Sequence, residues 1–177
     1  MGQREDLLDG AKRCLVERGY AHTTARDITA ASGANLGSIG YHFGSKEALM
    51  NEAMIELSTE AVERLREPAG TSLTATWTGL IDSFTEQRDL WTAVLESATQ
   101  AIRVPDIRER LADAQDEARK VFGERLSRTD ADAAGAVQFA LIAGVMMQHL
   151  VAPERAPSAE TVIRGLKALA GDPTSPE

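Results

Sequence analysis

Cysteine is nearly absent from this sequence: Cys14 is the only one among 177 residues. No disulfide can therefore form within the chain, which fits a reducing compartment and leads us to expect the cytoplasm. We expect Cys14 to be a small buried side chain on the first helix, with redox sensing as the alternative. Metal-ligand spacing is missing among the three histidines as well, so no metal site is expected; they are His22, His42 and His149.

The signatures of enzymes and of exported proteins are also missing. The sequence has no GxSxG elbow, no glycine loop to cradle a phosphate, no zinc motif and no paired acid and base on a shared face. We therefore expect neither an enzyme nor a bound cofactor. No cationic segment followed by an apolar run opens the chain, so a signal peptide is not expected.

Alternating apolar and polar residues, the pattern of a half-buried strand, occur nowhere. Apolar residues recur instead at helical spacing along nearly the whole chain, which predicts an all-α fold of about nine helices. The most apolar stretch runs from Ala133 to Ala152 and is long enough to span a membrane. It contains Gln138, Gln148 and His149, so we favour a helix buried in a core or at a subunit interface, and no membrane partner.

The charge is unevenly distributed between the two ends of the sequence. Hydrophobic residues make up 43% and charged residues 26%, as in a globular protein with a core, and the net charge is −8. Residues 1–50 hold six basic and six acidic side chains, so all of the excess negative charge lies in residues 51–177. A neutral N-terminal segment is compatible with a face that binds nucleic acid.

The stretch from Thr23 to Met50 carries the most specific pattern. Thr24 is suited to cap a helix, and Asp27, three residues later, completes a capping box. That helix ends before Gly33, which suits a tight turn with a positive φ angle. A second short helix follows, roughly Asn35 to His42. Two short helices joined by a glycine turn form a helix-turn-helix, whose second helix lies in the major groove of DNA.

The second helix and the start of the next one offer side chains suited to DNA. Gly37 and Ser38 are small enough to let the backbone approach base edges, and Asn35 can hydrogen-bond to them. Ser45 can cap the following helix, whose free N–H groups then face the DNA backbone. The longer side chains that suit phosphate oxygens are Tyr41, His42 and Lys46. Ordinary solvated surface positions are the alternative for these residues.

Several spaced elements recur in a fixed order along this segment. They are Ala11, Glu17-Arg18-Gly19-Tyr20, Thr23-Thr24, Asp27-Ile28, Ala31-Ser32-Gly33, Gly37-Ser38-Ile39, Tyr41-His42-Phe43 and Ser45-Lys46-Glu47-Ala48-Leu49. In these elements residues 4–50 resemble the N-terminal domain of the tetracycline-repressor (TetR) family of bacterial transcription regulators. The resemblance implies a three-helix helix-turn-helix domain over 1–48 and a helical ligand-binding and dimerisation domain over 49–177.

The resemblance also assigns roles to residues and shows one departure. It implies that Phe43 packs the three-helix core. Gly40 stands where the family usually has a large residue, which puts the operator sequence in doubt; glycine weakens a helix by about 1 kcal/mol. Residues at phosphate-contacting positions are Thr24, Tyr41, His42 and Lys46. Those at the base-reading end are Ala34, Asn35, Leu36, Gly37 and Ser38.

The resemblance further implies a small-molecule pocket and a dimer. Polar or aromatic residues on apolar helices are candidates to line the pocket, with plain core packing as the alternative; they are Trp77, Phe84, Trp91, Gln138, Met146 and His149. The last two helices, about 131–150 and 158–170, are expected to form a four-helix bundle with a second copy. On the first of them Phe139, Ile142, Met146 and Leu150 share one side, with small residues close by, and packing within the monomer is the alternative.

Together these features predict a homodimeric repressor that binds a palindromic double-stranded DNA operator and is released by an unknown small molecule. We expect the long helix from about Lys46 to Glu67 to link the two domains mechanically. A DNA-binding regulator without a small-molecule ligand is the first alternative. A helical scaffold that binds only protein is the second, and it predicts that no DNA fragment is bound.

Overall fold

The structure, a computed structural model, describes residues 2–66, 72–126 and 129–171. Within these ranges the chain is all-α, as the sequence predicts, with no strand. The helices are α1 (Gln3–Arg18), α2 (Ala25–Ser32), α3 (Leu36–Phe43), α4 (Lys46–Arg66), α5 (Leu73–Glu86), α6 (Arg88–Ala101), α7 (Pro105–Leu126), α8 (Ala131–Val151) and α9 (Ala159–Ala170).

Side-chain caps define where several helices begin. The predicted caps Thr24 and Ser45 are confirmed, since each side-chain oxygen accepts a hydrogen bond from the backbone N–H three residues later. Ser158 caps α9 in the same way. Asp130 caps α8, since its carboxylate accepts a hydrogen bond from the N–H of Ala133, at 3.2 Å.

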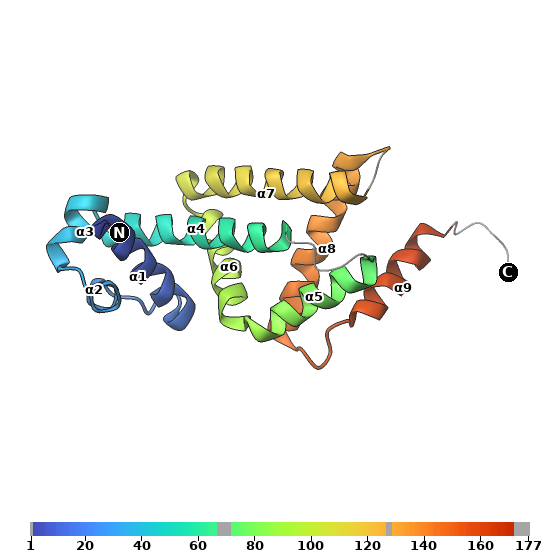
Figure 1. The fold of residues 1–177 in the computed structure, drawn as a ribbon, viewed down its shortest axis with the longest axis horizontal. Coiled ribbons are helices and arrows are strands. Elements are labelled where there is room, and N and C mark those ends of the chain that lie inside the picture. The colour runs from blue at the N-terminus through green and yellow to red at the C-terminus, as the bar shows by residue number, and fades with distance from the viewer. Residues whose placement is uncertain (1, 67–71, 127–128, 172–177) are drawn as a thin grey trace.

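The helices form two groups joined by α4 (Figure 1). Helices α1, α2 and α3 gather around the first turns of α4, which then leads away from them. Helix α7 runs beside α4, and α5, α8 and α9 pack together at the far end. The predicted boundary at residues 48 and 49 falls inside α4, so any division of the chain there cuts a continuous helix.

Two hydrophobic cores correspond to the two groups. The first core, around α1 to α4, includes Leu7, Ile28 and Leu49, none of which is exposed. Cys14 also lies in it, and burial raises the pKa of its thiol, so the prediction of a small buried side chain is confirmed. The second core lies among α4 to α9; its largest members are Trp77, Phe84 and Trp91.

Helices α7 and α8 approach each other unusually closely. A Cβ atom at Gly135 would lie 1.9 Å from the carbonyl oxygen of Arg119, and one at Gly123 would lie 2.0 Å from that of Ala131. Any larger residue at either position would force the two backbones apart. These two glycines therefore fix the direction in which α8 crosses the second core.

Helix α8 has one side packed and one side bare. Among the described residues it is the one helix long and apolar enough to cross a membrane, and 39% of its most apolar window is buried. Ile142, Met146 and Leu150 pack into the second core, so for this side the alternative of monomer packing is confirmed. The opposite side carries exposed apolar residues, including Val137 (57% exposed) and Val151 (77% exposed).

Candidate nucleic-acid interface and ligand cavity

The helix-turn-helix is held by local hydrogen bonds at its start and at its turn. The backbone N–H and the hydroxyl of Thr24 both donate to the carboxylate of Asp27, at 2.9 and 2.6 Å. These bonds lower the pKa of Asp27 below its usual range, because they favour the charged form. Gly33 ends α2 with φ 72°, in the left-handed region, so the predicted glycine turn is confirmed.

Helix α3 is packed on one side and exposed on the other. Ile39 is buried in the first core, and Phe43 packs against the same core with the guanidinium of Arg4 4.9 Å from the centre of its ring. Leu36, Gly37 and the other small residue Gly40 are exposed. This side of the helix is bare protein surface, as a helix that enters a DNA groove requires.

Of the residues predicted to read base edges, Ser38 is buried and Asn35 caps α3. Ser38 is only 5% exposed, so its expected place on the outward face is wrong. The reason is the helical period, which turns Ser38 and Ile39 together toward the first core. Asn35 is exposed and caps α3, its Oδ1 accepting from the N–H of Ser38 at 3.0 Å. Its Nδ2 amide group remains a donor for base edges. Ala34 is half-buried against the first core.

The expected phosphate-contacting residues lie around the starts of α2 and α4. Tyr41 is 85% exposed, and its ring meets the half-buried His42 edge to face at 4.8 Å. Lys46 folds back toward α2: its Nζ donates to the carbonyl oxygen of Thr23 at 3.3 Å and lies 5.8 Å from the centre of the Tyr20 ring. Lys46 therefore lies beside the start of α2, where Thr24 is exposed.

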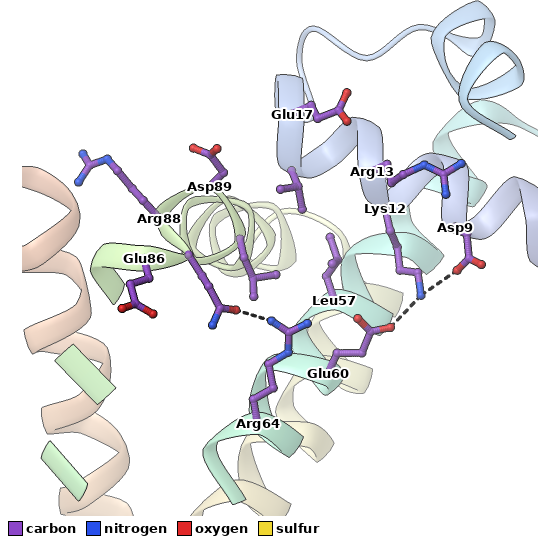
Figure 2. Close-up of a pocket in the computed structure, with 13 residues that line it drawn as sticks. Asp9, Lys12, Arg13, Glu17, Leu57, Glu60, Arg64, Glu86, Arg88 and Asp89 are labelled. Carbon is purple, nitrogen blue, oxygen red and sulfur yellow. Dashed lines mark hydrogen bonds and ion pairs between the residues drawn. The ribbon is translucent and has the colours of Figure 1, made fainter. Parts of the chain in front are cut away.

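A charged groove of about 560 Å³ separates α1 from the turn between α5 and α6 (Figure 2). Lys12 of α1 lines the groove and reaches to α4, with its Nζ 2.8 Å from Glu60 and 3.1 Å from Glu56, and also 3.1 Å from Asp9 on its own helix. Burial alone would lower the pKa of Lys12, but these carboxylates raise it above its usual range. The sequence pattern gives no sign of the contacts with Glu56 and Glu60, because these residues lie more than forty positions from Lys12 in the chain.

Helix α6 also touches the first group of helices directly. The carboxylate of Glu96 accepts a hydrogen bond from the backbone N–H of Tyr20 at 3.1 Å, just beyond the end of α1. The same helix places Leu90 and Ala93 in the first core and Trp91 in the second. The long helix α4 is thus accompanied by a second connection between the two groups.

An apolar cavity of about 350 Å³ lies among α4, α6, α7 and α8. Trp91 and Met146, two of the predicted pocket residues, line it. Its lining residues are Ser58, Ala61, Val62, Trp91, Val94, Leu95, Ala98, Leu111, Ala114, Gln115, Phe139, Ile142, Ala143, Gly144, Met146 and Met147.

The other predicted pocket residues do not line this cavity. Trp77, Phe84, Gln138 and His149 are all buried, but they face other parts of the second core. The rings of Phe84 and Trp91 meet edge to face at 5.1 Å, and the Nε2 of His149 lies 3.1 Å from the carbonyl oxygen of Pro157. Helical spacing shows that a residue is buried, not which neighbours surround it.

Helices α2 and α3 are short, are joined by the turn at Gly33, and the second of them is exposed on one side. These features define the protein as a member of the helix-turn-helix class. Comparison with known families then places it within that class. Residues 7–53 match the model described as bacterial regulatory proteins of the tetR family, and residues 68–169 match the tetracyclin repressor-like C-terminal domain. The chain belongs to the TetR family of transcriptional regulators.

Individual relatives agree with this assignment. The transcriptional repressor AcnR of Corynebacterium efficiens is 30% identical over 129 residues, which are 72% of this chain and 66% of that protein. The match thus spans just under two thirds of AcnR. The transcriptional regulator LmrA of Bacillus subtilis is 30% identical over 168 residues, covering 87% of this chain and 89% of LmrA.

Solved structures show the same fold over the full length. SCO7518 from Streptomyces coelicolor A3(2) superposes with a TM-score of 0.74 at 24% identity, covering 96% of this chain and 99% of that one. The multidrug binding protein EbrR, complexed with imidazole, superposes with a TM-score of 0.74 at 20% identity, covering 99% and 98%. At these identities the likeness shows the fold alone.

Proposed function

We propose that this protein is a transcriptional repressor whose two copies bind a palindromic DNA operator and release it when a small molecule binds. The observation that carries the proposal is the bare side of α3, held in place by the Asn35 cap, the Gly33 turn and the buried Ile39. A short helix presented in this way fits the major groove. We propose that the protein acts in the cytoplasm, because its operator DNA would lie there.

Within this proposal two kinds of contact are made with DNA. The phosphate backbone is held by Thr24, Tyr41, His42 and Lys46: Tyr41 and His42 belong to α3, and Lys46 reaches back to Thr23, next to the exposed Thr24. Base edges are met by the start of α3, where Ser38 is excluded by its burial. The remaining residues there are Ala34, Asn35, Leu36 and Gly37.

The second copy is proposed to pack on the bare side of α8 together with α9. Val137 and Val151 on α8 and Leu169 on α9 are large apolar residues left exposed by the monomer. Large apolar residues left exposed on neighbouring elements are typical of an interface between subunits. Two recognition helices are also needed to read two half-sites about one helical turn apart.

The dimer can be tested by charge substitutions and sedimentation. We expect Val137→Asp and Val151→Asp each to shift the protein toward monomer, since a charge would be buried without a partner. Ile102→Asp is the matched control, because Ile102 is 74% exposed and lies outside α8 and α9. Equal behaviour of all three variants would disprove this interface.

DNA binding is tested by selecting bound fragments from random double-stranded DNA and sequencing them. The proposal requires a motif with two inverted halves whose centres lie about one helical turn, or a multiple of it, apart. Selection of a single unpaired half-site would remove the dimer from the proposal. Recovery of no motif, with no retardation of any fragment, would favour a scaffold that binds only protein.

The proposal includes release of the operator by a small molecule. The alternative is a DNA-binding regulator that has no small-molecule ligand. Support for release comes from the apolar cavity and from α4 and α6, which each contact both the cavity and the first group of helices. A ligand that favours one arrangement of these helices would shift the population of dimers able to span the operator. Titration of the dimer–operator complex with cell metabolites separates the two alternatives.

A further inference from the structure

The described lining of the apolar cavity contains no charged side chain. Its sixteen described lining residues include no Asp, Glu, Lys, Arg or His. An ion placed there would lose its hydration without gaining a partner, which costs several kcal/mol or more. The charged groove beside Lys12 shows the opposite character, with acidic and basic side chains already engaged with one another (Figure 2).

One cation beside the cavity, Arg119, already has a carboxylate partner. The guanidinium of Arg119 lies 5.7 Å from the centre of the Phe139 ring, and Phe139 lines the cavity. Arg119 also pairs with Asp116, with 2.9 Å between its Nη1 and the carboxylate. This pairing leaves little net charge to attract an anionic ligand.

Two polar side chains interrupt the apolar lining. Gln115 is half-buried, and its amide group can offer a donor and an acceptor to a ligand. The hydroxyl of Ser58 donates to the carbonyl oxygen of Met54 at 2.9 Å and keeps its lone pairs as acceptors. One carbonyl, hydroxyl or amide group on a ligand would therefore find a partner here.

Aromatic surface lines one wall of the cavity. The indole of Trp91 is fixed, because its Nε1 donates to the hydroxyl oxygen of Ser83 at 3.0 Å and Phe84 packs against its ring. The flexible side chains of Met146 and Met147 line the cavity too, and methionine adapts readily to ring-shaped partners. The volume of about 350 Å³ lies near the lower end of the range for small-molecule sites, which is about 300–1,000 Å³.

We infer that the effector of this regulator is an uncharged, largely apolar molecule containing a ring, which lies against Trp91 and Phe139 and bonds to Gln115 through one polar group. The inference rests on the proposed ligand-responsive function and names the chemical class that its cavity accepts. Anions such as phosphorylated metabolites and strongly hydrated cations such as primary amines would find no charged partner among the described lining residues.

The test uses the full chain with Trp77→Phe, which leaves Trp91 as the sole tryptophan. Trp91 fluorescence is followed while three probes are added separately. N-phenyl-1-naphthylamine is neutral, 8-anilino-1-naphthalenesulfonate is its anionic counterpart, and 1-naphthylmethylammonium is a primary ammonium ion. We expect the neutral probe to quench Trp91 and to bind at least about tenfold more tightly than either ion. Binding of either ion as tightly as the neutral probe would overturn the inference.

A matched pair of variants tests the location. Ala114 lines the cavity, whereas Ala112, on the same helix, is exposed and does not. Ala114→Leu should reduce binding of the neutral probe by about tenfold or more by filling the space, and Ala112→Leu should leave it unchanged. Equal probe affinity in the two variants, with the fold of both checked by circular dichroism, would show that the probe binds elsewhere.

Gln115→Leu tests the polar group. A neutral naphthalene probe that carries a carbonyl, 6-propionyl-2-dimethylaminonaphthalene, should lose several-fold in affinity, whereas N-phenyl-1-naphthylamine should not. An equal effect on both probes would remove Gln115 from the site.

The class of ligand and the DNA-binding function can fail separately. All probe titrations are made without DNA, and operator binding by the same protein is measured in parallel. A protein that binds the neutral probe but no DNA would overturn the proposed function and leave the class of ligand standing. A protein that binds its operator but none of the neutral probes would overturn the class alone.

Discussion

The two hydrophobic cores of this protein differ in how completely they are filled and satisfied. In the first core Leu7, Ile28 and Leu49 have no exposed surface, and the buried hydroxyl of Thr23 donates to the carbonyl oxygen of Gly19 at 2.8 Å. In the second core the Nε1 of Trp77 and the Nδ1 of His149 are buried without a hydrogen-bond partner among the described residues. The apolar cavity adjoins the same core.

This difference suits the two tasks that we propose. A dense core with paired polar groups holds a recognition helix in one position, since close packing resists small displacements. A core with a cavity and unpaired polar groups can adopt a second arrangement when a ligand fills it. Variants in one core should therefore leave the property of the other unchanged, and only residues at the junction should alter both.

The largest effect is expected for Asn35→Ala, at the start of the recognition helix. It removes both the cap of α3 and a donor for base edges, which should weaken operator binding by about 1–3 kcal/mol with a further cost of about 1 kcal/mol for the cap. Operator affinity is measured by fluorescence anisotropy, and probe affinity by quenching of Trp91.

Asn35→Ser separates the two contributions, because serine caps a helix but lacks the amide. We expect it to keep the stability of the protein and to change which base pairs are preferred. If either variant lost its affinity for the neutral cavity probe, the expectation that changes near the first core leave the cavity unaffected would be wrong.

A smaller effect is expected for Lys46→Ala. If Lys46 contacts a phosphate, its loss should weaken binding to all DNA sequences alike, and the slope of log affinity against log salt should become shallower by about one. The measurement is a salt titration with operator and with unrelated DNA. His22→Ala is a suitable control, since His22 is exposed in the turn before α2 and outside the proposed contacts. An unchanged salt slope would remove Lys46 from the interface.

Lys12→Met tests the junction between the two groups of helices. It leaves Asp9, Glu56 and Glu60 close together without their cation, and we expect a loss of stability on the order of 1 kcal/mol, because the site is partly solvated. The raised pKa of Lys12 means that its contribution is complete at neutral pH and is lost only as the pH rises through that raised pKa.

The Lys12→Met effect is measured by chemical denaturation near pH 7. We also expect the variant to weaken the effect of ligand on DNA binding, which no change within a single core should do. Lys120→Met, an exposed lysine on α7, is the control. Equal stability of the two variants would show that the Lys12 contacts contribute little.

The smallest effect is expected for Gly40→Ala. A Cβ atom at Gly40 would meet nothing within 4 Å, so packing within the chain does not require glycine at this position. Alanine should stabilise α3 by up to about 1 kcal/mol, seen as a higher melting temperature. If operator affinity falls while stability rises, the space at Gly40 is needed by the DNA. A fall in stability instead would show that the free chain does require glycine there.

The sequence was a good guide wherever a local rule applies. The capping box of Thr24 and Asp27, the left-handed Gly33 and the caps Ser45 and Ser158 follow from hydrogen bonds that span only a few residues. The prediction failed at Ser38: its small polar side chain suggested contact with DNA, but its position in the helical period places it on the buried side of α3. A small polar residue gives no sign of which side of a helix it occupies.

By itself, then, the sequence determined the helices, their ends and the helix-turn-helix, because these depend on neighbours within one or two turns. Only the tertiary structure decided that Trp91 lines a cavity while Trp77 does not, and that Lys12 meets Glu60 across 48 positions. Such contacts depend on how whole helices cross, as Gly123 and Gly135 set for α7 and α8. Periodicity fixes which side of a helix is buried, but the crossing of helices fixes what lies against it.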